Sequence, residues 1–278
     1  MKSLIALSIL LCPAWAFEIR RPRDTQRELF LESMVQKVVV SSRITNARTA
    51  APNQFPYQAG LSVYDGEKYE FCGGSLISIE WVLTAAHCTL TAVKVKIYLG
   101  SITYLDYIEC LEVEKSNIIV HPEFDPETGR NDIALIEIPD VTYTAAIQPV
   151  SLPKRDSCYH TYVNKVVVAA GWGLTSDIST SNSPVLQFAY FRVISNEVCA
   201  EEYGPSIIDS RKMCTATVNR IGICRGDSGG PLVLASSNLQ IGIISFFANN
   251  KCESDAPDGY TRVTSYLDWI QENTNLKL

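Results

Sequence analysis

The stretch at residues 222–233, "GICRGDSGGPLV", places Ser228 between an aspartate and two glycines, directly ahead of an apolar run typical of a β-strand. Gly226, Gly229 and Gly230 leave the backbone on both sides of the serine without side chains, so the chain can turn sharply there. Two interpretations follow: Ser228 is a nucleophile on a tight turn, or it is a polar residue between two strands. The first interpretation requires catalytic partners for Ser228 elsewhere in the chain.

A nucleophilic serine needs a base to take its proton, and the base needs an acceptor that fixes its tautomer. The chain has three histidines, and His87 ends the apolar run "LTAAHC". Asp132, in "NDIALIE", directly precedes a strand-like run, where a carboxylate is costly unless it accepts hydrogen bonds. These two residues are therefore the candidate partners of Ser228, and we expect His121 and His160 to be solvated loop residues.

Short runs rich in Val, Ile, Tyr and Phe recur between turn residues, which predicts an all-β protein. Examples are "YQAGLSVY" (57–64), "VKVKIYLG" (93–100), "KVVVAAGWG" (165–173) and "LQIGIISFF" (239–247). A division into two barrels is expected near residues 140–160. Helical spacing appears only at the C-terminus, at Val263, Tyr266, Leu267 and Ile270, and a capping box of Ser265 and Asp268 is expected to start that helix.

The N-terminal residues predict that the protein is secreted. Residues 1–16 combine Lys2 with a short apolar run and a cleavage site of small residues, as in a secretory signal peptide, and the run is too short to span a membrane. Cys12 leaves with it, and the other eight of the nine cysteines would enter an oxidising compartment, where most should pair. Residues 17–43 are charged, contain no cysteine and end at Arg43. A net charge of −6 and the lack of a basic stripe argue against a nucleic-acid partner.

Seven segments in order resemble the chymotrypsin-like serine proteases over residues 44–278: "RITN", "CGGSLI", "LTAAHC", "NDIALI", "GWG", "GDSGGP" and "YTRVTSYLDWI". The resemblance implies two six-stranded antiparallel β-barrels with a C-terminal α-helix. It also implies a triad in the family's chain order, with His87 as base and then acid, Asp132 as orienting carboxylate and Ser228 as nucleophile. The backbone N–H groups of Gly226 and Ser228 would form the oxyanion hole.

The same resemblance implies an activation step and three disulfides. Cleavage after Arg43 would free the amine of Ile44 to pair with Asp227, although "ITNA" departs from the family's usual Ile-Val-x-Gly start. The implied disulfides are Cys72–Cys88, Cys199–Cys214 and Cys224–Cys252. Cys110 and Cys158 match no family bridge, so a mutual pair, two free thiols or a bond to another molecule all stay open.

The primary specificity pocket is expected to involve Gly222, Ile223, Arg225, Ser245, Phe246, Phe247 and Asp258. Gly222 stands where trypsins carry an aspartate, and Phe247 stands where a glycine usually opens the pocket. This combination with Asp258 looks like that of some arthropod digestive and collagenolytic proteases. Asp258 either faces the pocket, where it could pair with a cationic substrate side chain, or turns to solvent or nearby backbone.

The sequence therefore predicts a secreted serine endopeptidase made as a zymogen, with residues 1–16 as signal peptide, 17–43 as propeptide and 44–278 as peptidase domain. A digestive, monomeric enzyme activated by a trypsin-like protease is the first interpretation. A cascade protease and a catalytically silent homologue that acts as a binding module are the alternatives. No cofactor or metal is expected, because the cysteines and histidines lack zinc-ligand spacing.

Overall fold

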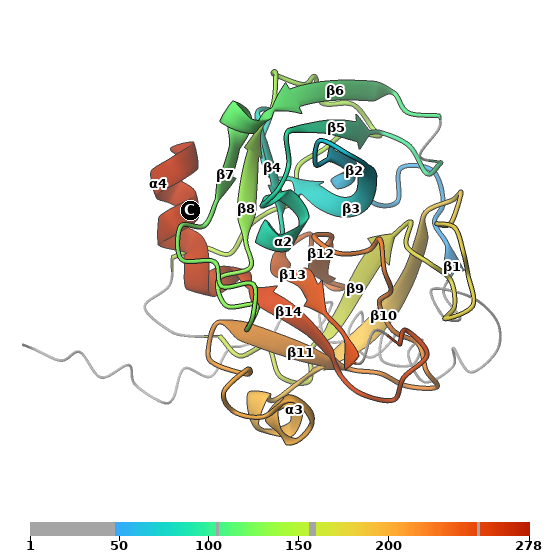
Figure 1. Cartoon of the computed structure of the whole chain (residues 1–278), viewed down its shortest axis with the longest axis vertical. Helices are drawn as coiled ribbons and strands as arrows, with labels where there is room; N and C mark the ends of the chain where they lie inside the picture. The colour runs from blue at the N-terminus through green and yellow to red at the C-terminus, as the bar shows by residue number, and fades with distance from the viewer. Residues whose placement is uncertain (1–47, 104–105, 156–159, 249–250) are drawn as a thin grey trace, which may run out of the picture.

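The computed structural model describes residues 48–103, 106–155, 160–248 and 251–278, which form two antiparallel β-sheets packed together (Figure 1). The strands of the first sheet are β2 (Gln58–Tyr64), β3 (Tyr69–Leu76), β4 (Trp81–Thr84), β5 (Lys94–Leu99), β6 (Glu109–Glu114), β7 (Ile118–Val120) and β8 (Ala134–Glu137). The strands of the second sheet are β1 (Arg48–Thr49), β9 (Val166–Gly171), β10 (Gln187–Ile194), β11 (Lys212–Ala216), β12 (Pro231–Leu234), β13 (Gln240–Phe246) and β14 (Asp258–Arg262). The helical elements are α2 (Ala86–Thr89), η1 (Lys115–Asn117), α3 (Asn196–Tyr203), η3 (Val263–Tyr266) and α4 (Leu267–Thr274).

The second sheet closes into a barrel of six strands. Its order is β10-β11-β14-β13-β12-β9, and β9 pairs again with β10, while β1 joins the outside of β10. The sequence "VVVAAG" of β9 is buried throughout, as expected of a strand with both faces covered. The second sheet thus leaves an edge only at the two-residue β1, and so short an edge offers little to pair with another chain.

The first sheet curls around the other half of the core but has the open order β6-β5-β2-β3-β4-β8-β7. Strand β5 alternates half-buried lysines and tyrosine with buried valine, isoleucine and leucine, so only one of its faces meets the core. The prediction of two β-barrels with a C-terminal helix is confirmed, except that this half is open rather than six-stranded and closed. Strand β7 has only three residues, and all three pair with β8, so it does not extend to β6.

The crossing between the sheets runs from the end of β8 at Glu137 to the start of β9 at Val166, which spans the predicted division near 140–160. One hydrophobic cluster contains residues of both sheets, including Leu83 and Ile97 from the first and Val168 and Ile243 from the second. The sheets are therefore held together by a shared core, and the functional side chains lie where the ends of their strands meet.

The C-terminal helix packs on the first sheet, at the left of Figure 1 beside β7 and β8. Val263, Tyr266, Leu267 and Ile270 are all buried in the shared core, as their spacing predicted. The predicted capping box is wrong. Residues 263–266 form a 3₁₀ turn, so α4 begins after it with Tyr266 at its N-cap, and no side chain caps the helix.

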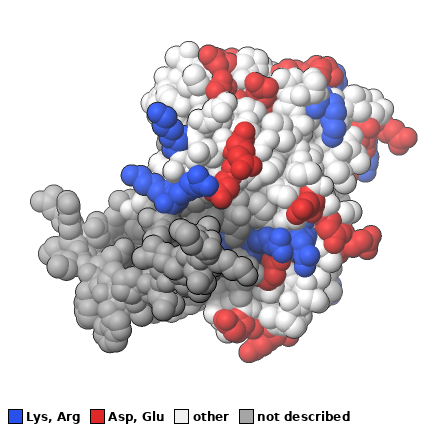
Figure 2. Space-filling model, turned by 90° about the vertical axis from the view of Figure 1, so that its left-hand side faces the viewer, with Lys and Arg blue, Asp and Glu red and all other residues white. Residues whose placement is uncertain are grey.

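His121 is not the solvated loop residue that the sequence suggested. Its ring lies 5.6 Å from the ring of Tyr266 and 5.1 Å from that of Trp269, so it forms part of the contact between β7 and α4. Burial lowers the pKa of His121. The face around α4 carries acidic and basic side chains interspersed (Figure 2). Within the described residues, none of the helices combines the length and apolar character needed to cross a bilayer.

Candidate active site

Strand pairing brings His87 and Asp132 together. Strands β4 and β8 are antiparallel, and their pairing ends with Thr84 opposite Ala134. His87 comes three residues after the end of β4 and Asp132 two residues before β8, so both lie just beyond the same end of this pair. His87 Nδ1 is 2.8 Å from Asp132 Oδ2, and the His87 backbone N–H donates to Asp132 Oδ1 at 2.9 Å. The two contacts fix the imidazole with Nε2 pointing away from the carboxylate.

The carboxylate of Asp132 is buried and fully engaged. Ser245 Oγ donates to Asp132 Oδ2 at 2.6 Å, and Thr261 Oγ1 donates to the Asp132 backbone carbonyl at 2.7 Å. Burial alone would raise the pKa of Asp132, but the charge of His87 and these hydrogen bonds hold it below its usual value. Burial lowers the pKa of His87, while Asp132 raises it by charge and hydrogen bond, and the net result lies above the ordinary value. The arrangement thus favours an ionised carboxylate beside an imidazole that accepts protons readily.

Ser228 lies next to this pair on the loop between Cys224 and β12. The Cys88 sulfur, in the Cys72–Cys88 disulfide, lies 3.7 Å from His87 Nε2 and 3.6 Å from the Ser228 carbonyl oxygen. The backbone N–H of Gly73 in β3 donates to the same carbonyl at 2.7 Å, which fastens the loop to the first sheet. In the described part of the chain, no hydrogen bond joins Ser228 to His87 Nε2.

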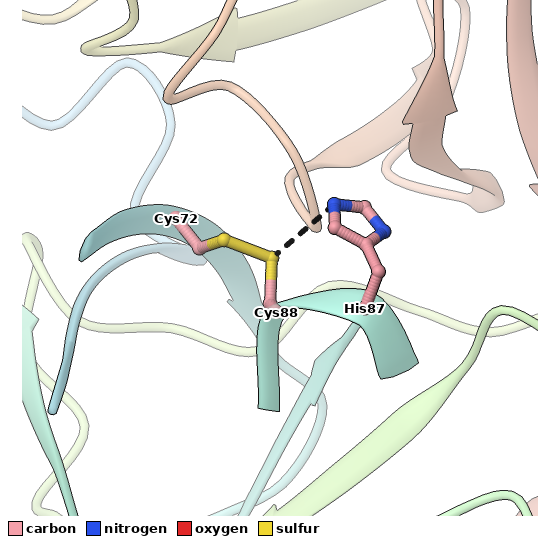
Figure 3. Close-up of side chains that lie close together, drawn as sticks. All are labelled: Cys72, His87 and Cys88. Carbon is pink, nitrogen blue, oxygen red and sulfur yellow. Dashed lines mark hydrogen bonds between the residues drawn. A yellow bond between two sulfur atoms is a disulfide. The ribbon is translucent and has the colours of Figure 1, made fainter. Parts of the chain in front are cut away.

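Cys72, His87 and Cys88 form the one group of potential metal ligands among the described residues. Figure 3 shows why this group is a poor metal site: the two sulfurs are bonded to each other, and the dashed contact runs from that disulfide to the imidazole. Metal ligation by cysteine needs the thiolate, which a disulfide does not provide. The imidazole therefore contacts the disulfide through Nε2 and Asp132 through Nδ1.

The backbone around Gly226 forms a turn that suits glycine. The Asp227 N–H donates to the Cys224 carbonyl at 3.0 Å, which closes a turn in which Gly226 has φ +95°. A side chain there would be strained, and its Cβ would lie 3.0 Å from Gly173 Cα. Within the described residues, the N–H groups of Gly226 and Ser228 donate to no protein acceptor. Two such donors beside a nucleophile are what an oxyanion hole requires.

Asp227 is a buried carboxylate held by backbone groups. Its Oδ1 accepts from the Gly173 N–H at 2.8 Å and its Oδ2 from the Cys224 N–H at 2.9 Å. Burial raises the pKa of Asp227 to about 6, although both hydrogen bonds act to lower it. The predicted signal peptide and propeptide, with Arg43 and Ile44, lie outside the described residues. The anionic form of Asp227 is costly in this environment and is suited to a cationic partner.

The structure places Asp258 beside Gly222 rather than in solvent. Asp258 is 3% exposed, and its Oδ2 accepts the Ile223 N–H at 3.0 Å. A Cβ on Gly222 would lie 3.3 Å from Oδ2 and 3.4 Å from Oδ1, so the carboxyl group faces this glycine. Burial raises the pKa of Asp258 well above its usual value, and the charge of Asp227 adds to the effect. The alternative in which Asp258 turns to solvent is wrong. The alternative of a hydrogen bond to nearby backbone is present, and the carboxyl group lies beside Gly222 at the same time.

The other expected pocket residues lie in different environments. Arg225 is exposed, Phe247 is half-buried against the core of the second barrel, and the Ile223 side chain is buried inside that core. Ser245 is tied to Asp132, as described above. The Phe246 ring packs edge-to-face on Tyr203, with 5.1 Å between centroids. Only the backbone of Ile223, and not its side chain, faces Asp258.

The structure contains the three disulfides that the family resemblance implied. They join Cys72 to Cys88, Cys199 to Cys214 and Cys224 to Cys252. The third ties the Gly222–Ser228 loop to the segment that precedes β14. Cys110 in β6 is a free, exposed thiol, and Cys158 lies outside the described residues.

Sequence reasoning missed two residues that surround Asp132. Thr261 binds its carbonyl from β14, and Lys212, opposite Thr261 in β11, is buried at 4% exposure. Strand alternation offered a signal for the lysine, because Lys212 shares a face with Cys214, two residues later, which forms a disulfide. A lysine in register with a buried cystine is unusual enough to mark the position.

His87 and Asp132 come from one β-sheet and lie next to the loop that carries Ser228 in the other, and hydrolases with a serine nucleophile use residues of these three types. The comparisons agree with this class. The sequence profile of the family described as Trypsin matches residues 44–270. The chain therefore belongs to the trypsin family, and it is a chymotrypsin-like serine endopeptidase of the arthropod type.

The relatives are similar along most of their length. A collagenase of Hypoderma lineatum is 45% identical over 235 residues, which cover 84% of this chain and 88% of the relative. Brachyurin of Leptuca pugilator is 42% identical over 229 residues, covering 82% and 96%. The solved structure of HL collagenase matches with a TM-score of 0.79 and 44% identity, covering 84% of this chain and 99% of the other. The predicted resemblance to arthropod collagenolytic proteases is confirmed.

Proposed function

We propose that this chain is the secreted zymogen of a digestive endopeptidase that cleaves polypeptides through Ser228, His87 and Asp132. The single observation that carries the proposal is the buried Asp132, bonded to both His87 and Ser245, beside a serine loop with two unbonded N–H groups. The similarity to a collagenase and to brachyurin supports polypeptide substrates outside the cell. The enzyme works as a monomer without a cofactor.

Acylation begins when Ser228 Oγ attacks the carbonyl carbon of the scissile peptide bond. His87 Nε2 takes the hydroxyl proton as the new carbon–oxygen bond forms, and Asp132 stabilises the resulting imidazolium. The N–H groups of Gly226 and Ser228 donate to the oxyanion, and each such donor is worth about 3–4 kcal/mol in the transition state. The carbon–nitrogen bond then breaks, and His87 returns the proton to the leaving amine.

Deacylation repeats the same proton path with water in place of the serine. His87 Nε2 takes a proton from the attacking water, and the second tetrahedral intermediate uses the same oxyanion hole. Its collapse breaks the ester bond, releases the carboxylic acid and returns the proton through His87 to Ser228 Oγ. The hydrogen bond between Ser228 and His87 forms in this cycle, since such bonds are often long before substrate binds.

Activation requires cleavage after Arg43. The new amine of Ile44 would pair with Asp227, whose buried carboxyl has only backbone donors among the described residues. Because Asp227 lies between Gly226 and Ser228, its pairing would hold both N–H groups of the oxyanion hole in place. Residues 17–43 contain no cysteine, so the released propeptide would leave the enzyme.

The primary pocket should accept a broad set of side chains. Phe247 narrows the entrance and favours apolar side chains of medium size, such as Leu or Met, with some tolerance for Phe or Tyr. The Asp258 carboxyl beside Gly222 would ionise beside a cationic substrate side chain, which adds Arg and Lys to the profile. Because arginine would be a secondary preference, the enzyme would not readily cut its own chain after Arg43, and a separate trypsin-like protease would activate it.

Substitution of Ser228 by alanine tests the proposal. The activated Ser228→Ala enzyme should lose roughly 10⁶-fold in kcat, as removal of the serine from such a triad does. The matched control is Ser237→Ala, in the turn between β12 and β13, which should keep wild-type turnover. Both variants should keep the wild-type circular dichroism. Turnover near the wild-type rate in folded Ser228→Ala would overturn the assignment.

A further inference from the structure

Lys212 presents an ammonium ion that the reaction as described does not use. It opens β11 and is 4% exposed, and its Nζ donates to the Gly129 carbonyl at 2.7 Å. The same atom lies 4.8 Å from the centroid of the Phe246 ring. Gly129 has φ +62°, and a Cβ there would lie 3.1 Å from Nζ. The glycine therefore leaves space for the ammonium ion, but a carbonyl and an aromatic ring only partly offset the cost of burying a charge.

Asp132 carries a negative charge that acts on the Lys212 ammonium ion, and three indirect connections place Lys212 in the group of residues around Asp132. Lys212 stands opposite Thr261, whose hydroxyl donates to the Asp132 carbonyl at 2.7 Å. Ser245, which donates to the Asp132 carboxylate at 2.6 Å, directly precedes the phenylalanine that faces the ammonium ion. The carbonyl that the ammonium ion binds belongs to a residue only three positions before Asp132. Strands β11, β13 and β14 and the loop before β8 thus all contribute residues to the surroundings of Asp132 and Lys212.

The charges around this place are few. Burial lowers the pKa of Lys212, while the negative charges of Asp132 and Asp209 raise it and Arg130 lowers it. The Arg262 guanidinium lies on the other side and donates to the Lys212 carbonyl. Asp209 is itself held by Arg211 at 3.1 Å. Asp132 is therefore the one acid in this group whose role belongs to the reaction.

The imidazole of His87 is affected by the same cation. Burial has the largest effect and lowers the pKa of His87, and the positive charge of Lys212 lowers it further, while Asp132 and, by a smaller effect, Glu70 raise it. Without an opposing cation, a buried carboxylate would keep the imidazole protonated to a higher pH. A protonated His87 cannot accept the serine proton, so this balance decides the lowest pH at which the enzyme works.

We propose that Lys212 is a positioning residue for proteolysis: its buried ammonium ion, held by the Gly129 carbonyl and the Phe246 ring in the group of residues around Asp132, keeps His87 able to act as a base. The inference rests on the proposed triad. Lys212 acts through Asp132 and His87 and does not touch the substrate.

Three variants of the activated enzyme separate this role from a purely structural one. Lys212→Arg keeps the charge, Lys212→Gln loses the charge but can still donate to the Gly129 carbonyl, and Lys212→Met loses both. We expect the acid limb of the kcat/KM profile to move up by roughly 0.5–1 pH unit in the Gln and Met variants. Below that limb their rates should fall about three- to tenfold, with the alkaline plateau retained. Lys212→Arg should keep the wild-type limb.

A structural role predicts a different pattern. If the lysine only anchors the Gly129 loop, Lys212→Gln should behave as wild type and Lys212→Met should lose activity equally at all pH values. Either that pattern or an unchanged acid limb in Lys212→Gln overturns the proposal. NMR titration of the His87 ring in Ser228→Ala, with and without Lys212→Gln, measures the same shift without turnover. If the activated wild-type enzyme showed no peptidase activity that depends on Ser228, the proposed function would be refuted. The NMR titration would still decide whether Lys212 acts on His87.

Discussion

The buried Asp227 carboxyl should make the stability of the uncut chain depend on pH. The perturbation is Asp227→Asn, made in a Ser228→Ala background so that no self-digestion interferes. In the uncut chain the folded state holds the Asp227 proton more tightly than the unfolded state, because burial raises the pKa to about 6. Stability from this group is therefore present at acid pH and is lost as the pH rises through about 6.

The magnitude follows from the shift. A rise from 3.8 to about 6 costs about 3 kcal/mol of unfolding free energy once the group is ionised in both states. Between pH 5 and pH 8 the cost grows by about 1.4 kcal/mol, because part of it is already present at pH 5. Cleavage after Arg43 should abolish this term, since the Ile44 amine would keep the carboxylate ionised in the folded state.

Urea unfolding at pH 5 and pH 8 measures the effect. The uncut chain should lose about 1.4 kcal/mol more than its Asp227→Asn variant over this range, and the trypsin-cut chain should not. Titrating groups remote from Asp227 contribute equally to both members of each pair, while Asp258, whose pKa the charge of Asp227 raises, adds to the Asp227-dependent loss in the uncut chain. An identical pH dependence in the uncut chain and its Asp227→Asn variant would refute the reasoning. Equal Asp227-dependent losses before and after cleavage would refute the proposed ion pair.

Three further predictions concern activation, substrate specificity and the hydrogen bond between Ser245 and Asp132. Arg43→Gln should block conversion by trypsin and leave the chain inactive in a peptidase assay, so full activity of this uncut variant would contradict the activation step. Asp258→Asn, which can still accept the Ile223 N–H, should remove cleavage after Arg and Lys in a peptide library and spare cleavage after Leu; unchanged basic cleavage would exclude Asp258 from the pocket. Ser245→Ala should lower kcat/KM by roughly 10- to 150-fold through the lost hydrogen bond to Asp132, because a hydrogen bond to a charged acceptor is worth about 1.5–3 kcal/mol, and Ser206→Ala, on a surface turn, should not change it.

The sequence predicted those features that are local or carried by short motifs. The short β-rich runs predicted an all-β protein, and the spacing of Val263 and Ile270 predicted the buried face of the C-terminal segment. The two barrels and the roles of His87, Asp132 and Ser228 were implied by the family resemblance of short motifs. Each of these signals lies within about a dozen residues. The disulfides also came from the family resemblance rather than from spacing.

The remaining features depend on contacts between distant segments. Arg48 pairs with Phe188, so the short β1 belongs to the second barrel although it precedes the first sheet in the chain. Alternation with Cys214 marks Lys212 as an unusual lysine, but only its pairing with Thr261, which binds the Asp132 carbonyl, connects it to Asp132. The two environments considered for Asp258 differ only in which way one side chain turns. The capping box failed because a 3₁₀ turn changed where the helix begins, which the side-chain pattern does not encode.

Labelling with a serine-directed organophosphate, followed by peptide mapping, tests the central claim most directly. After cleavage behind Arg43, the account predicts one label per chain, on Ser228, with complete loss of peptidase activity. His87→Ala should label far more slowly because the serine loses its base. Absence of label in the cut, folded chain, or labelling of another residue with Ser228 unmodified and activity lost, would contradict the assignment of Ser228 as nucleophile.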